Sequence, residues 1–253
     1  MPGVWHIVDC MGVCMTLLEG ENAAMLVDTG YGIEDVADFM RHMTDLPLTV
    51  FLTHNHHDHA MGARCFPETY MLEADMADWD MFTNDKMRRR VLTQAIGKNL
   101  TVDEKTFLAG EIPLPKVMKP GVIDLGGLTA EIIEAPGHTP GSAVVYVPER
   151  KLLLSGDDWN PCTWLFFPQA LGLREYRSNM RGIQQLPFEK VLCPHREALY
   201  DRWMFDDFFN ALTDGNLRAA EPVNIAPYEQ IDTCQATLPH DQVLVFDWAK
   251  SGL

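Results

Sequence analysis

Apolar and polar residues along the chain are arranged first in the pattern of short strands and then in that of helices. Three apolar runs, at residues 4–10, 13–19 and 23–30, are separated by turn residues and predict an antiparallel meander. Residues 32–43 carry apolar side chains at helical spacing. The continuous apolar run 48–54 predicts a strand that leads directly into a histidine-rich stretch.

The second part of the chain repeats this order of elements. A charged, methionine-rich segment at 72–95 has a helical pattern, and a proline-containing loop follows it. The other predicted elements are strands at 128–135, 142–147, 151–156 and 189–193, and helices at 174–186 and 196–219. Two comparable halves of strands and helices predict stacked sheets with helices outside, and the lack of a linker predicts a single domain over residues 1–253.

Composition narrows the choice of partners. The 253 residues are 47% hydrophobic and 22% charged, as in a soluble globular protein. The net charge of −16 disfavours nucleic acid and anionic membrane surfaces, so a small-molecule substrate is expected. Neither a signal peptide nor an apolar run of membrane-spanning length is evident, which predicts a cytoplasmic location.

The stretch THNHHDH at 53–59 holds four of the nine histidines. His54 and His56, two residues apart at a strand end, can point to one side. Asp58 and His59 follow where the chain turns and can approach from another direction. This donor set suits zinc and also accepts iron or manganese. Because the four side chains cannot all reach one ion comfortably, we expect two ions and further ligands elsewhere.

Three more candidate ligands follow predicted strands. His138 lies between two Pro-Gly pairs, Asp157 follows the run LLLSG, and His195 follows KVLCP. A lone histidine is usually structural, but the shared position after strands favours a common role. Asp158 competes with Asp157, and only the position directly after Gly156 favours the latter.

Other residues with possible chemistry are more readily explained by packing. His6, His42 and His240 are each isolated, which is typical of structural or surface histidines. The six cysteines lack CxxC spacing, so we expect them to be reduced and packed. Cys10 and Cys14 could in principle share a metal, but the strand pattern around them favours packing.

Together these motifs resemble those of the metallo-β-lactamase superfamily. The signature H-x-H-x-D-H is similar to residues 54–59, and the other matching motifs are LVDTG (26–30), PGHTPGS (136–142), SGDD (155–158) and PHRE (194–197). The resemblance covers nearly the whole chain and implies an α+β fold, the four-layer αββα sandwich. It also implies that Asp28 orders the metal loops, and it gives the variable position His57 no ligand role.

The resemblance implies a full set of ligands. The first metal would be bound by His54, His56 and His138, the second by Asp58, His59 and His195, and both by the bridging Asp157. This bridge is typical of the glyoxalase II, lactonase and phosphodiesterase branches. Classical β-lactamases lack it, which counts against antibiotic hydrolysis. His56 stands where flavodiiron relatives have Glu, which also favours the hydrolases.

The function expected from this pattern is that of a binuclear metal-dependent hydrolase. A metal-bridging hydroxide would attack a small ester, thioester, lactone or phosphodiester, and the catalytic Asp58 would hold or relay its proton. The alternative is a mononuclear iron oxidoreductase of the persulfide dioxygenase type. A third possibility is a metal-stabilised binding protein without catalysis.

Two aromatic segments are candidates for the substrate pocket. Residues 71–82 and the run Trp159–Phe167 could line a channel, or they could be core. Arg88, Arg89 and Arg90 could receive a substrate carboxylate or phosphate, or they could form the solvated face of a helix.

Overall fold

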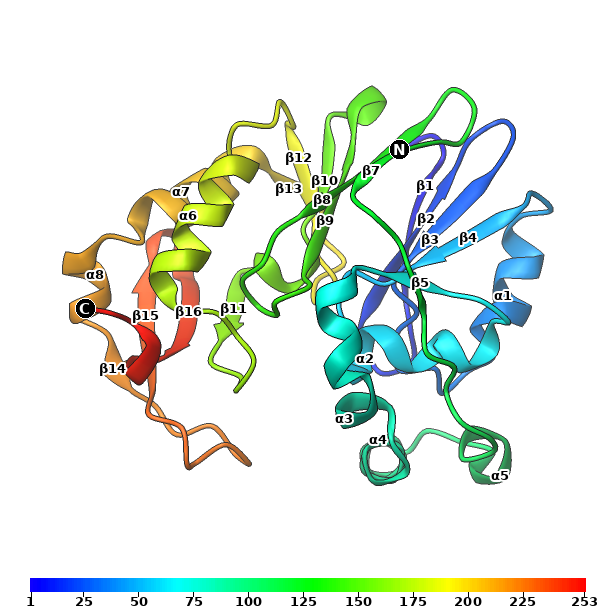
Figure 1. Cartoon of the computed structure of the whole chain (residues 1–253), viewed down its shortest axis with the longest axis horizontal. Helices are drawn as coiled ribbons and strands as arrows, with labels where there is room; N and C mark the ends of the chain where they lie inside the picture. The colour runs from blue at the N-terminus through cyan, green and yellow to red at the C-terminus, as the bar shows by residue number, and fades with distance from the viewer.

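The computed structural model describes residues 1–253 and contains three sheets (Figure 1). The first sheet has the spatial order β1 (Val4–Val8), β2 (Cys14–Glu19), β3 (Ala24–Val27), β4 (Leu48–Phe51), β5 (Tyr70–Met71) and β6 (Lys116–Val117). The second has the order β13 (Tyr200–Asp201), β12 (Lys190–Leu192), β10 (Leu152–Leu154), β9 (Ala143–Val147), β8 (Thr129–Glu134) and β7 (Gly121–Asp124). The third has the order β11 (Cys162–Leu165), β16 (Gln242–Asp247), β15 (Thr233–Leu238) and β14 (Glu221–Pro222).

The helices are short. The α-helices are α1 (Val36–Met43), α2 (His57–Ala60), α3 (Trp79–Thr83), α4 (Asp85–Gly97), α5 (Glu104–Phe107), α6 (Leu173–Ile183), α7 (Arg202–Ala211) and α8 (Asp214–Arg218). The 3₁₀ segments are Met61–Cys65, Glu73–Asp78, Pro148–Arg150, Gly156–Asp158, Pro239–Asp241 and Trp248–Lys250. None of the helices combines the length and the apolar character that crossing a lipid bilayer requires.

Four layers stack across the two larger sheets, which confirms the expected αββα sandwich. Helix α1 has a polar outer face and buries Val36, Ala37 and Met40 against the first sheet, and the side chain of Asp35 caps its first turn. The inner faces of the two sheets pack on each other, so β3 and β9 are buried on both sides and consist of apolar residues. Helices α6 and α7 cover the second sheet, and the third sheet lies beside them and shares their core cluster (Figure 1).

Strand pairing brings the chain segments that follow the strands to one edge of the sandwich. The meander β1–β2–β3 is antiparallel, as predicted, whereas β3 and β4 are parallel and pair Val27 with Phe51 at their carboxyl ends. In the second sheet, β10 and β12 are parallel and pair Leu154 with Leu192 at their carboxyl ends. The loops that start at these four strand ends therefore begin next to one another in each sheet.

Two predicted helices are shorter in the structure. The helical pattern at 72–95 is divided into a 3₁₀ segment, α3 and α4, because the Asn84 side chain accepts a hydrogen bond from the Met87 amide and starts a new helix. The helix predicted at 196–219 begins only at Arg202, because Tyr200 and Asp201 pair with β12, and it ends before α8.

The third sheet was not predicted. Strand β11 lies within the uncharged stretch 159–173, and it pairs in parallel with β16, which is almost eighty residues away in the sequence. Strands β15 and β16 form an antiparallel pair that buries Cys234, Ala236 and Phe246 against α6 and α7. The third sheet thus extends the core cluster on the outer side of the second sheet.

Candidate metal centre

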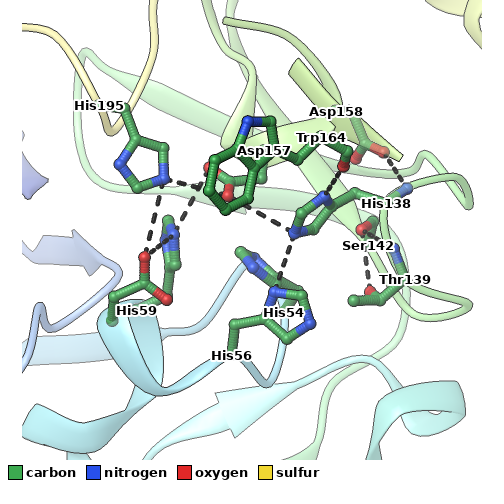
Figure 2. Close-up of polar contacts among 12 residues, drawn as sticks. His54, His56, His59, His138, Thr139, Ser142, Asp157, Asp158, Trp164 and His195 are labelled. Atoms are coloured by element: carbon green, nitrogen blue, oxygen red, sulfur yellow. Dashed lines mark hydrogen bonds and ion pairs between the residues drawn. The ribbon is translucent and has the colours of Figure 1, made fainter. Parts of the chain in front are cut away.

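Seven side chains from both sheets converge at the edge where the parallel strands end (Figure 2). Their donor atoms fall into three overlapping groups, in each of which all atoms lie within 4.8 Å of one another. The groups are His54, His56 and His138; His54, His59 and Asp157; and Asp58, His59 and His195. The first and third are the two sets that the sequence motifs imply, and the second joins them through Asp157.

The histidine-rich stretch positions four of these side chains through a turn and not through strand alternation. Strand β4 ends at Phe51, so His54 and His56 lie beyond it and the expected alternation along a strand is wrong. His56 is the N-cap of α2, and Asp58 and His59 lie in this single-turn helix. Because the chain changes from extended to helical at His56, the side chains of Asp58 and His59 point in a different direction from those of His54 and His56.

Asp157 lies between the two sets of histidines (Figure 2). Its Oδ2 atom is 3.1 Å from Nε2 of His195 and 3.5 Å from Nε2 of His138. Its Oδ1 atom is 3.5 Å from Nε2 of His59. Asp158 points elsewhere, since its Oδ1 accepts a hydrogen bond of 3.0 Å from the His138 amide. The carboxylate that contacts both sets is therefore that of Asp157.

Several donor atoms in the cluster are buried and lack partners. His54 Nε2, His59 Nε2 and Asp157 Oδ1 are inaccessible to solvent and form no hydrogen bond. The Nδ1 atom of His56 faces Nε2 of His138 at 2.9 Å, so two ring nitrogens are directed at one another. Buried polar atoms are normally satisfied, and this arrangement is the one expected around a bound cation. The residues fit divalent metal ions.

The protonation of three of the five imidazoles agrees with this fit. Burial lowers the pKa of His54 and His56 well below the usual histidine value, and neighbouring imidazoles lower it further. Burial also lowers the pKa of His138. These three rings are therefore neutral, the form in which an imidazole nitrogen can bind a metal.

The two carboxylates are ionised. Burial alone would raise the pKa of Asp58, but the charges of His59, His57 and His195 lower it to about 2. Burial opposes ionisation of Asp157 as well, yet the nearby histidines His195 and His59 hold its pKa well below the usual value. Burial would lower the pKa of His59 and His195, but Asp157 and Asp58 raise it, so these two rings carry positive charge beside the two carboxylates.

Two histidines of the cluster are oriented by hydrogen bonds on their other ring nitrogens. Asp28 Oδ2 lies 3.0 Å from Nδ1 of His59, and Asp28 Oδ1 accepts hydrogen bonds from the amide and hydroxyl of Thr53. Nδ1 of His138 donates to the carbonyl of Trp164 at 2.6 Å. Such outer contacts fix the ring orientation and the tautomer of metal ligands. These contacts agree with the expectation that Asp28 orders the metal loops.

The LVDTG turn packs tightly on α2. The amide and the hydroxyl of Thr29 both donate to the carbonyl of His59, at 2.8 and 2.7 Å. A Cβ atom on Gly62 would lie 2.1 Å from the Thr29 carbonyl oxygen, so only glycine permits this approach. The turn therefore holds the short helix that carries Asp58 and His59.

Asp75 is a buried residue that the sequence pattern did not single out. Its carboxylate accepts hydrogen bonds from the Asn55 amide (3.2 Å), the Thr139 hydroxyl (2.7 Å) and the Gly141 amide (2.6 Å). The Asn55 side chain in turn donates to the Asp75 carbonyl at 2.9 Å. Asp75 thus connects the loop of His54 and His56 to the loop of His138.

Replacing Asp75 with alanine is expected to weaken metal binding by roughly 10–100-fold, the usual cost of losing an outer partner of metal ligands. Zinc affinity can be measured by competition with a chromophoric chelator. Glu73→Ala, at an exposed position of the same 3₁₀ segment, is the control and should leave affinity unchanged. A folded Asp75→Ala protein with wild-type zinc affinity would show that the connection has no role in the centre.

The residues attributed to packing lie outside the seven-residue cluster. His6 contacts Thr16 and the carbonyl of Arg196, while His42 and His240 lie on helix and turn surfaces. All six cysteines are free. Cys14, Cys193 and Cys234 are buried, whereas Cys162 is exposed, so the expectation of packing is wrong for Cys162. His57 stacks edge-on against Tyr31 and belongs to none of the three donor groups.

A cavity of about 470 Å³ adjoins the cluster. Its lining shows which residues of the two aromatic segments face a pocket and which belong to the core. Of the aromatic residues in the run 159–167, Trp164 and Phe167 line it, whereas Trp159 and Phe166 are fully buried in the core. Of residues 71–82, only Phe82 lines it, because Trp79 is buried and donates to the Ile112 carbonyl. The pocket wall is thus formed by part of each segment.

The three neighbouring arginines of α4 have different surroundings. Arg88 is buried and donates to the Gly110 carbonyl at 2.8 Å. Arg89 pairs with Asp85 at 2.8 Å on the outer surface. Only Arg90 lines the cavity.

Comparison with known proteins agrees with this geometry. The family model described as the metallo-beta-lactamase superfamily matches residues 8–195. The chain belongs to the metallo-beta-lactamase superfamily. Its metallo-beta-lactamase fold is also found among solved structures. A metallo-beta-lactamase family protein from Thermus thermophilus superposes with a TM-score of 0.57 at 18% identity, over 87% of this chain and 82% of that one.

Two further relatives of this metallo-beta-lactamase superfamily member are informative. The acyl-coenzyme A thioesterase MBLAC2 of Gallus gallus is 26% identical over 202 residues, which is 71% of this chain and 70% of that protein. The protein TTHA1623, solved in a di-iron-bound form, has a TM-score of 0.57 at 19% identity, over 80% of this chain and 96% of that one. The likeness to both solved structures concerns the fold.

Proposed function

We propose that this chain is a binuclear metal-dependent hydrolase that cleaves a small thioester or ester. The observation that carries the proposal is the arrangement of seven donor side chains in two sets that share Asp157. Two sets of donors favour two ions over the single iron of the dioxygenase alternative. Zinc is the metal that this mixture of imidazole and carboxylate favours. The similarity to the thioesterase MBLAC2 supports thioesters as the first class to test.

When bound, the two cations would supply an activated water and polarise the substrate carbonyl. The other steps fall to residues of the chain. Asp58 lines the cavity and is ionised, so it can accept a proton from the attacking water and deliver it to the leaving sulfur or oxygen. A bond forms between the water oxygen and the carbonyl carbon, the carbon–sulfur or carbon–oxygen bond breaks, and an acid and a thiol or alcohol leave.

The cavity beside the centre is suited to a small substrate. Its volume of about 470 Å³ lies within the range usual for small-molecule sites. Trp164 and Phe167 form part of its wall next to His56 and His138. These rings would exclude water from the reacting carbonyl and bind an apolar group.

Metal analysis combined with turnover tests this proposal. We expect two zinc ions per chain, hydrolysis of hexanoyl-coenzyme A or p-nitrophenyl hexanoate, loss of activity with a chelator and recovery with zinc. One iron per chain together with oxygen uptake on a persulfide substrate would instead establish the dioxygenase alternative. A zinc-loaded protein that hydrolyses neither substrate class would contradict the proposal.

A further inference from the structure

The end of the cavity next to His56 is aromatic. The ring centroid of Phe82 lies 4.5 Å from that of His56, and the ring of Phe167 lies 4.7 Å from it. Tyr228 packs edge-on against Phe167 at 5.4 Å and also lines the cavity. This end offers apolar ring surface.

Two arginines also line the cavity, Arg90 of α4 and Arg196. Tyr31 contacts the His57 ring at 5.5 Å, and Asp58 lies 3.8 Å from both His57 and His195. Arg196 directly follows His195 in the chain and donates to its carbonyl at 2.9 Å. The cavity wall therefore carries two cationic side chains besides its aromatic rings.

These two arginines have no carboxylate partner. The salt bridges of arginine in this chain are formed by Arg41, Arg88, Arg89, Arg177 and Arg202. The only carboxylates that line the cavity are Asp58 and Asp157, and both belong to the metal cluster. In a chain with a net charge of −16, two guanidinium groups without a salt bridge on the cavity wall can bind an anion.

We propose that the cavity selects a thioester or ester with an apolar group on one side of the scissile bond and an oxyanion on the other. The apolar group lies against the aromatic rings, and the oxyanion binds Arg90 and Arg196. This assignment of the substrate class rests on the proposed hydrolase function. Hydrolysis adds one water across the carbonyl–sulfur or carbonyl–oxygen bond, and the oxyanion itself stays intact.

Matched thioesters test the proposal. S-hexanoyl mercaptopropionate carries its carboxylate on the leaving group, S-hexyl monothioglutarate carries it on the acyl group, and S-hexanoyl mercaptoethyl phosphate carries a phosphate. The methyl ester of the first compound is the neutral reference. We expect zinc-loaded wild-type protein to prefer at least one of the anionic compounds at least about tenfold in kcat/KM, and the preferred compound identifies which side and which oxyanion the site takes.

Variants of α4 assign this preference to one residue. Arg90→Gln is expected to raise KM for the preferred anionic thioester about tenfold with little change in kcat, and to leave the neutral ester within about twofold. Arg90→Lys should keep part of the preference because it keeps the charge. Arg89→Gln is the matched control, since Arg89 is the adjacent residue of the same helix and pairs with Asp85 on the outer surface.

A binding measurement separates this proposal from the hydrolase function. S-hexyl mercaptopropionate is a thioether that no hydrolase can cleave, and calorimetry should give a Kd about tenfold weaker for Arg90→Gln than for wild type. Equal affinities, or equal kcat/KM for neutral and anionic thioesters, would overturn the oxyanion site while the hydrolase function stands. If the protein hydrolyses neither the thioesters nor p-nitrophenyl hexanoate, the hydrolase function fails and the calorimetry still decides on the oxyanion site.

Discussion

Replacing Asp157 with asparagine is expected to lower kcat/KM by more than about 10³-fold. Loss of a residue that only hydrogen-bonds to a metal ligand already lowers metal affinity or activity by roughly 10–100-fold, and we expect the loss of a direct ligand to have a larger effect. Asp157 contacts His138 in one donor set and His195 and His59 in the other. An amide has nearly the same shape but lacks the negative charge that both cations would share. We therefore expect the metal content to fall from two ions to one or fewer.

Metal content and thioesterase activity of the purified variant check this expectation, and circular dichroism checks that it is folded. The neighbouring Asp158→Asn is the informative control. Burial raises the pKa of Asp158 well above the usual value, so a neutral amide resembles the carboxyl group already present. Asp158→Asn should therefore lower kcat/KM by less than about tenfold. If Asp157→Asn kept two metal ions and similar turnover, Asp157 would not bridge them.

Truncating Trp159 to alanine is expected to lower the free energy of unfolding by about 3–5 kcal/mol, the usual cost of removing a buried aromatic side chain. The indole is fully buried and packs on Tyr200 and Phe205, with ring centroids at 5.5 and 5.6 Å. Its Nε1 atom donates to the side chain of Gln242 at 3.2 Å. Its removal leaves a cavity where the second sheet, α7 and the third sheet meet.

Trp164 provides a matched control from the same segment. It is 38% exposed and lines the substrate cavity, so Trp164→Ala should cost less than about 1 kcal/mol of stability. Urea denaturation followed by circular dichroism measures both variants. Equal losses of stability in the two variants would contradict the division of this segment into core and pocket. If Trp159→Ala does not fold, Trp159→Phe should show a smaller loss in the same direction.

The donor residues could be identified from the sequence because their signals are local. His54, His56, Asp58 and His59 lie within six positions, and so dense a group of imidazoles with a carboxylate is typical of a metal site. His138, Asp157 and His195 each follow an apolar run closely, and the ends of strands in neighbouring layers meet at one edge. Recognition of the family also supplied the αββα fold.

Residues whose role depends on distant partners could not be recognised in this way. Asp75 binds groups that are 20 and 64 positions away, and no local pattern marks it. The direction of Arg90 depends on how α4 packs beside the cavity, which also sends Arg88 inward to Gly110 and Arg89 outward to Asp85. Only tertiary packing decides among these three adjacent arginines.

The division of the aromatic run 159–167 follows from a strand that was not predicted. Within β11, residues 162 and 164 are exposed and residues 163 and 165 are buried, so Trp164 faces outward and Leu165 inward. The segment is uncharged and has no alternation of polarity, since both faces carry apolar side chains. Strand β11 exists because β16 pairs with it, a contact that a local pattern does not reveal.

Part of the cavity wall comes from a segment of the chain that carries none of the donor residues. Ala226, Pro227 and Tyr228 line the cavity, yet they follow the segment 8–195 that carries every donor residue and matches the superfamily. A change in this part of the cavity wall can therefore alter which substrate binds without altering the metal cluster. An exchange of this late loop would redirect the same chemistry to other molecules, so two homologues can share all seven donors and still serve unrelated metabolic roles.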